Sequence, residues 1–282
     1  MKKKILKTIA LVVALALIFI LAAFANSMVG NPVSRWLAKN ALEEHLKTNY
    51  PGTDYEVESF GFTFKTSDYY AHIRSDSSMD TQFTVYIDLL GRVRRDTFDS
   101  VTQGFVTARR LEDEYRALTD AVFANPLFPY EMDIDYGMLE TASRQALEDP
   151  NVTDIPPWAL IIEDLILDHV YDIRELGAQA GHLVVYVYSD TLDVETAAQV
   201  LLDIRAEFDR ANVPFRAISL TLRAPKTEEV WDETYIGVDF FDYQDIYEEG
   251  LVERVARADA ELKAYREQQD KEQKAYLETL DK

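Results

Sequence analysis

The chain has 282 residues, of which 29 are Lys or Arg and 50 are Asp or Glu, so its formal net charge is −21 at pH 7. This balance excludes a general nucleic-acid-binding protein, which needs a basic surface. With 48% hydrophobic residues and only 10 Gly and 9 Pro, the chain is also neither disordered nor collagen-like. The absence of cysteine excludes disulfides, thiolate nucleophiles and iron–sulfur sites. The composition therefore predicts a folded acidic protein of about two domains.

An apolar run over residues 9–25 is the most specific feature of the sequence. It follows four lysines, Lys2, Lys3, Lys4 and Lys7. A helix over residues 8–29 would be about 33 Å long, which is enough to cross the hydrocarbon core of a bilayer. The preceding lysines predict a cytoplasmic N-terminus. We therefore expect residues 1–30 to form a cytoplasmic basic tail and a transmembrane signal anchor of a single-pass cell-membrane protein whose bulk is extracytoplasmic.

In a second interpretation, the protein is also exported, but the N-terminal segment is a signal peptide that is cleaved off. Ala23-Phe24-Ala25 has the A-x-A pattern of a signal-peptidase site, and cleavage would make Asn26 the new N-terminus. The apolar run is longer than the usual signal-peptide core of about 7–15 residues, which favours the uncleaved anchor. A lipoprotein anchor is excluded because no cysteine follows the run.

Residues 31–150 are predicted to form a first α+β module with a helical extension. Apolar residues on one face predict a helix over 33–47, which Tyr50-Pro51-Gly52 ends. An antiparallel meander should follow, with one face covered by that helix. Its strands are expected at 55–64, 69–73, 83–88 and 92–98. The helical extension is expected at 101–124, followed by a short strand at 131–135 and a helix near 140–147.

Residues 151–241 are predicted to form a second α+β module of order β-β-α-β-β. Its strands are expected at 170–174, 183–188, 215–223 and 235–241. The first two should form a hairpin with a long turn, and the helix over 194–211, with Asp193 as its N-cap, should make a right-handed crossover. Residues 242–282 are predicted to form a C-terminal helix. It either docks at its start and frays at its end, or serves in self-association or partner binding.

Standard catalytic motifs are missing from the sequence. His45, His72, His169 and His182 form no H-E-x-x-H pair, and neither G-x-S-x-G nor S-x-x-K occurs. Gly177 and Gly181 lack the Lys-Ser/Thr of a phosphate-binding loop. We therefore assign no catalytic, cofactor-binding or metal-binding residues, and predict a binding or regulatory module rather than an enzyme.

Acidic and aromatic clusters leave weaker hypotheses open. Three acids on one predicted strand, Glu131, Asp133 and Asp135, are candidates for a loose Ca²⁺ site, although a solvated strand face is the simpler interpretation. A second acidic run comprises Asp239, Asp242, Asp245, Glu248 and Glu249. The alternative function is a carboxylate-dependent hydrolase acting on cell-wall glycan, but no pair of acids stands out. Tyrosines that are candidates for lining a peptide or glycan groove are Tyr69, Tyr70, Tyr186 and Tyr188.

Several local motifs resemble one bacterial family. They are Gly30-Asn31-Pro32 after the apolar run, the helix end at Tyr50-Pro51, the segment Tyr69-Tyr70-Ala71-His72, and Leu89-Leu90-Gly91. Together they resemble the YfjL-like proteins, an uncharacterised family of membrane-anchored proteins, and the resemblance implies no catalytic residues. Val85-Tyr86-Ile87-Asp88, with Gly91 and Val93, is similar to the strand–turn–strand of PepSY-type modules. That similarity implies a partner in the cell envelope, such as a peptidase or a cell-wall component.

Overall fold

The computed structural model describes residues 11–18, 20–21, 30–126, 128–225 and 234–280. They form two compact α+β units, which we describe separately: Met1–Thr107 with Ile166–Asp168, and Ala108–Leu165 with His169–Lys282. Of the predicted anchor, residues 11–18 and 20–21 are described and are helical. The rest of it, including the A-x-A pattern and Asn26, lies outside the described residues. Within the described part of the chain, no helix is both long enough and apolar enough to cross a bilayer.

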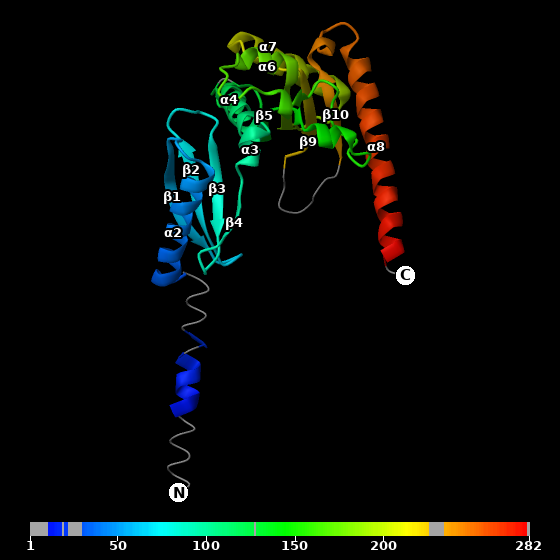
Figure 1. The fold of residues 1–282 in the computed structure, drawn as a ribbon. Helices are drawn as coiled ribbons and strands as arrows, with labels where there is room; N and C mark the ends of the chain where they lie inside the picture. The colour runs from blue at the N-terminus through cyan, green and yellow to red at the C-terminus, as the bar shows by residue number, and fades with distance from the viewer. Residues whose placement is uncertain (1–10, 19, 22–29, 127, 226–233, 281–282) are drawn as a thin grey trace, which may run out of the picture. The chain divides into compact units, whose positions relative to one another are not determined.

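The first unit is a helix packed on a four-stranded sheet (Figure 1). Helix α2 (Pro32–Asn49) precedes strands β1 (Tyr55–Thr63), β2 (Asp68–Ser75), β3 (Gln82–Ile87) and β4 (Val93–Asp96), which pair in this order and all antiparallel. Side chains alternate along β2 and β3, so one face is buried with Ala38 and Leu42 of α2. The predicted meander with a helix on one face is confirmed.

The start of α2 is fixed by its cap and by the second strand. Asn31 accepts a hydrogen bond from the Ser34 amide at 2.8 Å, and Pro32 follows at the first helical position. The hydroxyl of Tyr69 lies 2.9 Å from Ser34 Oγ and donates to the carbonyl of Asn31 at 3.1 Å. The first turn of α2 is therefore attached to the beginning of β2.

The helix predicted over 101–124 is two helices, α3 (Asp99–Thr102) and α4 (Phe105–Phe123), separated at Gly104, whose φ is +84°. A left-handed backbone angle of this kind ends a helix and favours glycine. Four buried residues of α4, Leu111, Tyr115, Val122 and Phe123, belong to the core of the second unit. The units consequently divide at residue 108 rather than near the predicted boundary at 150.

The second unit is built on a mixed sheet of order β10-β9-β8-β5. Its strands are β5 (Met132–Leu139), β8 (Gly181–Tyr188), β9 (Ala217–Arg223) and β10 (Tyr235–Asp242). Strands β8 and β9 are parallel and are joined by α7 (Val194–Ala211), so the predicted crossover is confirmed. Alternate residues of β8 and β9 are buried with α7, and the opposite face is only half-buried.

The predicted strand 170–174 and its hairpin are wrong. Ile173–Ala180 is helix α6, which Asp172 caps and whose Leu176 and Ala180 are buried. Those two residues lie four positions apart, which is helical spacing. Gly177, which suggested a turn, lies instead inside the helix, where it packs closely against Tyr115. The position beside β8 is taken by β5, which extends well beyond the predicted strand 131–135.

Shorter elements complete the second unit: β6 (Thr141–Ala142), α5 (Arg144–Glu148), β7 (Leu160–Ile161) and two 3-10 turns, Ile162–Asp164 and Tyr243–Asp245. The long C-terminal helix α8 spans Leu251–Leu280 and begins after Gly250, later than the predicted start at 242. Asp259 of α8 accepts a hydrogen bond from the amide of Gly237 at 2.9 Å, which attaches α8 to β10.

Candidate functional site

The four histidines are divided between the units and have local partners. His45 pairs with Asp96, and His72 lies 2.9 Å from Thr84 Oγ1, both in the first unit. His169 and His182 belong to the second unit. Among the described residues, no three His, Asp or Glu side chains lie close enough to hold a metal ion.

The acids of β5 do not converge on a cation site. Asp133 forms an ion pair with Arg223. Burial, with a smaller contribution from the charge of Asp120, raises the pKa of Asp135. Arg223 also lies over the rings of Tyr186 and Tyr188, at 5.1 and 5.2 Å from their centroids. These two tyrosines therefore contact an arginine of their own sheet.

A groove of about 650 Å³ with apolar and charged lining lies beside α8 in the second unit. It lies between the loop Thr153–Trp158, the bulged part of β10, and the exposed side of α8. Its apolar lining comes from Ile155, Pro156, Pro157, Trp158, Phe240, Ala258, Leu262 and Tyr265. Among the described residues, its charged lining consists of three acids, Asp154, Asp239 and Glu261, with no Lys or Arg. Of the second acidic run predicted from sequence, the structure brings only Asp239 to this groove.

Carboxylates surround the tyrosine of the groove. The hydroxyl of Tyr265 donates to Asp154 Oδ1 at 3.3 Å. The negative charge of Asp154, then burial, and then the charges of Asp239 and Glu272 raise the pKa of Tyr265. Each of these carboxylates disfavours a second negative charge at the tyrosine, and for the same reason favours a cation placed in the groove.

Phe240 forms a wall of the groove in a strained backbone conformation. Its φ is +46°, which is uncommon for a bulky residue outside turns. It lies in the irregularity between Val238 and Phe241, and its ring meets that of Trp158 edge-on with centroids 6.0 Å apart. Its other neighbour is the imidazole of His182, stacked at 4.4 Å. A bulge that turns a side chain in this way is typical of binding sites.

A chain of four polar side chains runs behind this wall, on the half-buried face of the sheet. His182 Nδ1 lies 2.6 Å from Glu140 Oε1, and His182 Nε2 lies 2.8 Å from Ser219 Oγ. Ser219 donates in turn to Asp239, and its oxygen accepts from the amide of Phe240 at 3.1 Å. Strands β8, β9 and β10 and the residue after β5 each contribute one member of this polar chain, so the sheet itself positions them.

Three hydrogen bonds join the four members of the polar chain. Buried polar groups of this kind are stable only when every member has its partner.

The order Glu140–His182–Ser219 resembles a Ser-His-acid catalytic triad. However, the Ser219 hydroxyl is already occupied by His182, Asp239 and the amide of Phe240, and Ser219 is not among the residues that line the groove. The ring of Phe240 also covers the imidazole. The arrangement therefore positions Asp239 and Phe240 and presents no free nucleophile.

Sequence reasoning did not find this site, because its members are far apart in the chain and no motif joins them. His182 and Ser219 become neighbours through parallel pairing of β8 with β9, in which His182 lies opposite Ala217 and Val184 opposite Ser219. The available signal was that Ser219 lies on the polar side of the strand predicted at 215–223, and that His182 directly precedes the strand predicted at 183–188. That signal becomes specific only when the pairing register is known.

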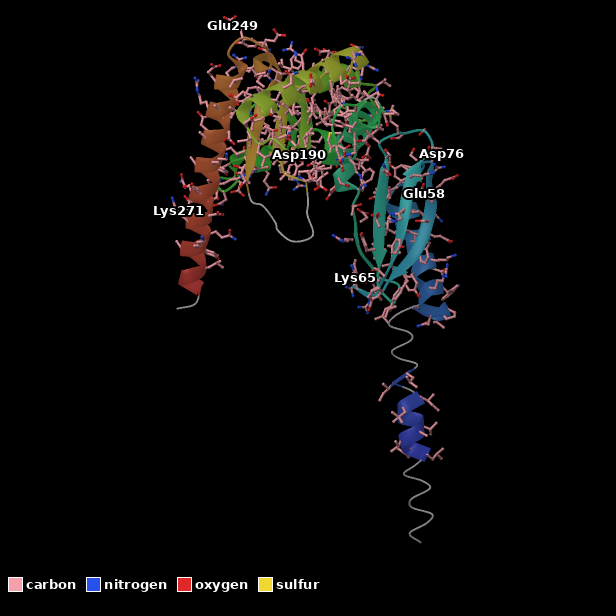
Figure 2. All side chains as sticks on the ribbon, turned by 180° about the vertical axis from the view of Figure 1, so that it is seen from behind. Glu58, Lys65, Asp76, Asp190, Glu249 and Lys271 are labelled. Carbon is pink, nitrogen blue, oxygen red and sulfur yellow. The ribbon has the colours of Figure 1, made fainter. Side chains whose placement is uncertain are left out.

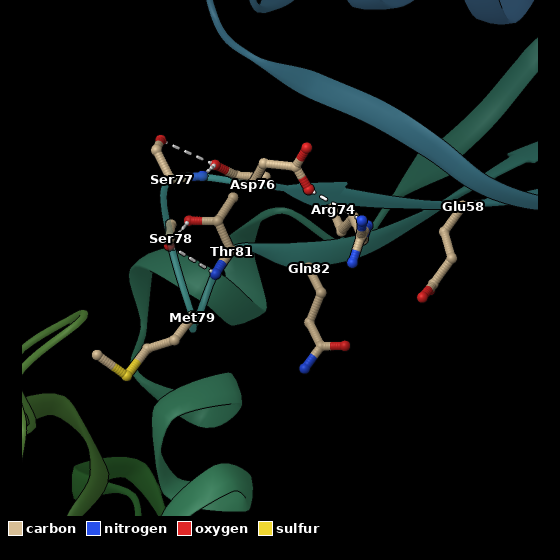
Figure 3. A pocket seen from close by; sticks show the side chains of 9 residues that line it. Glu58, Arg74, Asp76, Ser77, Ser78, Met79, Thr81 and Gln82 are labelled. Carbon is tan, nitrogen blue, oxygen red and sulfur yellow. Dashed lines mark hydrogen bonds and ion pairs between the residues drawn. The ribbon is translucent and has the colours of Figure 1, made fainter.

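A second hollow, of about 540 Å³, lies at the turn between β2 and β3 in the first unit (Figure 3). Its polar groups are largely paired with one another. Arg74 binds Asp76 at 2.9 Å, and Ser78 Oγ donates to Thr81 Oγ1 at 2.7 Å. Since these groups satisfy each other, this hollow is the weaker candidate for ligand binding.

Comparison with known protein families gives two matches, one in each half of the chain. Residues 2–97 match the model of the YfjL-like N-terminal domain, and residues 114–256 match the model of the YfjL-like C-terminal domain. No curated protein and no solved structure matches the chain.

Proposed function

This chain belongs to the YfjL-like family, and we propose that it is a membrane-anchored extracytoplasmic binding protein rather than an enzyme. Its ligand is a short peptide segment that carries a cationic side chain next to an apolar one. The observation that carries this proposal is the groove beside α8, in which aromatic and proline walls surround three carboxylates and the described lining contains no basic residue.

The anchor is supported by the N-terminal sequence and by exposure. Four lysines precede an apolar run that is free of charge. Within that run, the described large apolar side chains are more than half exposed, for example Leu11 at 61% and Leu21 at 67%. Exposed apolar side chains in such a continuous run match a lipid environment better than water. The preceding lysines favour a cytoplasmic N-terminus and an extracytoplasmic body.

The ligand class follows from the size and chemistry of the groove. About 650 Å³ is within the range of sites for small ligands and accommodates two or three residues of a peptide. The rings of Trp158, Phe240 and Tyr265 provide flat surfaces for an apolar side chain. Asp154 and Glu261 favour a Lys or Arg head, and an acidic peptide would be repelled. Catalysis is disfavoured because the nearby serine hydroxyl is fully engaged.

Fluorescence anisotropy with labelled peptides tests the binding proposal on the full-length protein in nanodiscs. The probes are acetyl-Lys-Phe-Lys-amide and its acidic counterpart acetyl-Glu-Phe-Glu-amide. We expect the cationic probe alone to bind, and the double variant Asp154→Asn, Glu261→Gln to weaken binding about tenfold, a loss of about 1.4 kcal/mol. Glu249→Gln, an exposed acid outside the groove, is the matched control. Equal binding of both probes, or an equal effect of the control, would refute the proposal.

A further inference from the structure

One end of the first unit carries four exposed apolar side chains. Val33 is 68% exposed, Trp36 61%, Phe64 59% and Leu90 65%. We call these four residues the basal surface. Large apolar side chains that cluster on a solvent-exposed surface indicate a contact with a partner or a membrane.

The topology places the basal surface at a single end of the unit. In an antiparallel meander, the β1–β2 turn with Phe64 and the β3–β4 turn with Leu90 lie at the same end. Helix α2 leads through Tyr50–Asp54 into the opposite end of β1, so its first turns, with Val33 and Trp36, also lie at the end of the two turns.

Close contacts agree with this placement. Gly91, next to Leu90, lies against α2, because a Cβ there would be 3.0 Å from the Cβ of Leu37. The start of α2 is held to β2 by the hydrogen bond from Tyr69 to Asn31, just beyond the β1–β2 turn. The two turns and the beginning of α2 consequently form one continuous surface.

Charge is distributed unevenly along the first unit. Exposed cations accompany the basal surface: Arg35, Lys39, Lys65 and Arg92. Two acids also lie at this end: half-buried Asp88 accepts hydrogen bonds from the amides of Leu90 and Arg92, and buried Asp68 forms an ion pair with Arg94 at 3.2 Å. The opposite end carries exposed acids, among them Asp54 and Asp76. Figure 2 shows Lys65 and Asp76 at opposite ends of the sheet.

We propose that the basal surface lies in the headgroup region of the membrane that the N-terminal anchor enters, in contact with anionic phospholipid. This inference rests on the proposed anchoring and adds an orientation of the first unit on the bilayer. The apolar run ends at Ala25 and α2 begins at Pro32, so the connecting chain spans at most about 25 Å. Trp together with Lys and Arg is the composition that proteins place at this depth, where the indole packs among headgroups and the cations meet lipid phosphates.

Quenching of tryptophan fluorescence by brominated lipids tests the proposal. The full-length chain is reconstituted into phosphatidylcholine/phosphatidylglycerol vesicles, with Trp158→Phe and Trp231→Phe leaving Trp36 as the single tryptophan; Trp231 lies outside the described residues. We expect brominated acyl chains to cause a loss of Trp36 fluorescence. The matched variant Trp36→Phe, Trp231→Phe retains only Trp158, in the second unit, and should keep its fluorescence.

Alkaline carbonate extraction of the same vesicles separates two failures. If the protein resists extraction and Trp36 fluorescence is the same with and without bromine, the basal surface does not contact lipid, although the anchor stands. If carbonate releases the protein, the proposed membrane anchor is refuted, and the proposed orientation of the first unit is refuted with it. Resistance to extraction together with quenching of Trp36 alone supports both.

Discussion

The phenyl ring of Phe240 lies on the imidazole of His182, with centroids 4.4 Å apart and planes inclined by 26°. Phe240 belongs to the wall of the groove, and His182 belongs to the polar chain behind it. The left-handed backbone of Phe240 costs on the order of 1 kcal/mol, which neighbouring contacts must offset. The shape of the groove therefore depends on a histidine that does not line it.

Replacing His182 should damage both stability and binding. His182→Ala removes two half-buried hydrogen bonds. It leaves Glu140 without a partner in the polar chain, and Ser219 keeps only Asp239 there, so we expect the free energy of unfolding to fall by about 2–4 kcal/mol. Binding of the cationic peptide should weaken as Phe240 loses its support. Urea unfolding and peptide anisotropy measure the two effects. The control is His72→Ala, which changes an exposed histidine of the first unit. If both variants lose the same free energy of unfolding, the hydrogen bonds of His182 do not stabilise the fold.

Asp80 and Asp168 form a reciprocal pair within the first unit. The carboxylate of fully buried Asp80 accepts the amide of Asp168 at 2.8 Å and the hydroxyl of Thr107 at 2.9 Å. The carboxylate of Asp168 in turn accepts a hydrogen bond from the Asp80 amide at 3.0 Å, and the φ of Asp168 is +59°. These bonds attach the distant segment Ile166–Asp168 to the β2–β3 turn.

Asp80→Ala should destabilise the first unit by about 2–3 kcal/mol, because it leaves the half-buried amide of Asp168 and the buried hydroxyl of Thr107 without an acceptor. Asp76→Ala, in the same turn, removes only an exposed ion pair with Arg74 and should cost less than about 1 kcal/mol. Hydrogen exchange of the β2 and β3 amides measures the difference. Equal protection in the two variants would contradict the prediction.

Asp96 should make the first unit sensitive to acid. Burial acts to raise its pKa, but hydrogen bonds from Tyr50 and His45 outweigh it, so the pKa of Asp96 is lowered. A carboxyl group with a lowered folded pKa stabilises the fold above its unfolded pKa of about 3.9, and this stabilisation is lost as the pH falls through the folded value.

Comparison with Asp96→Asn measures this contribution. At about pH 5, we expect the wild type to exceed the variant by about 1–2 kcal/mol in unfolding free energy, because charged hydrogen bonds are lost. At about pH 2–3 the gap should shrink, since Asp96 itself becomes protonated. Urea titrations at both pH values give the two gaps. A gap that stays constant or widens in acid would be inconsistent with a lowered pKa.

Local periodicity was enough to predict much of the fold. The alternation of Phe83, Val85 and Ile87 places β3, and the spacing of Val194, Ala197, Leu201 and Ile204 places α7. Periodicity failed at residues 170–174, where a helix that starts at Asp172 was taken for a strand. It also missed the break at Gly104, because apolar spacing continues across that glycine.

The candidate site was beyond sequence reasoning for a different reason. Asp239 appeared only as one member of an acidic run of five residues, and Trp158 was not among the predicted binding residues. Their importance comes from tertiary placement: β10 is bulged at Phe240, and the loop Thr153–Trp158 folds beside α8. Neither a bulge nor the packing of a proline-rich loop has a local signature that a single sequence reveals.

The central claim, that an extracytoplasmic groove binds cationic peptide segments, is tested most directly by cysteine labelling in intact cells. The chain has no cysteine, so each introduced thiol is unique. Ala258→Cys places a thiol in the groove without removing a charge, and Asp190→Cys places one on an exposed surface outside it. We predict that a membrane-impermeant maleimide labels both from outside, and that acetyl-Lys-Phe-Lys-amide slows labelling of Ala258→Cys alone. Labelling only after permeabilisation would contradict the location, and equal labelling with and without the peptide would contradict the binding.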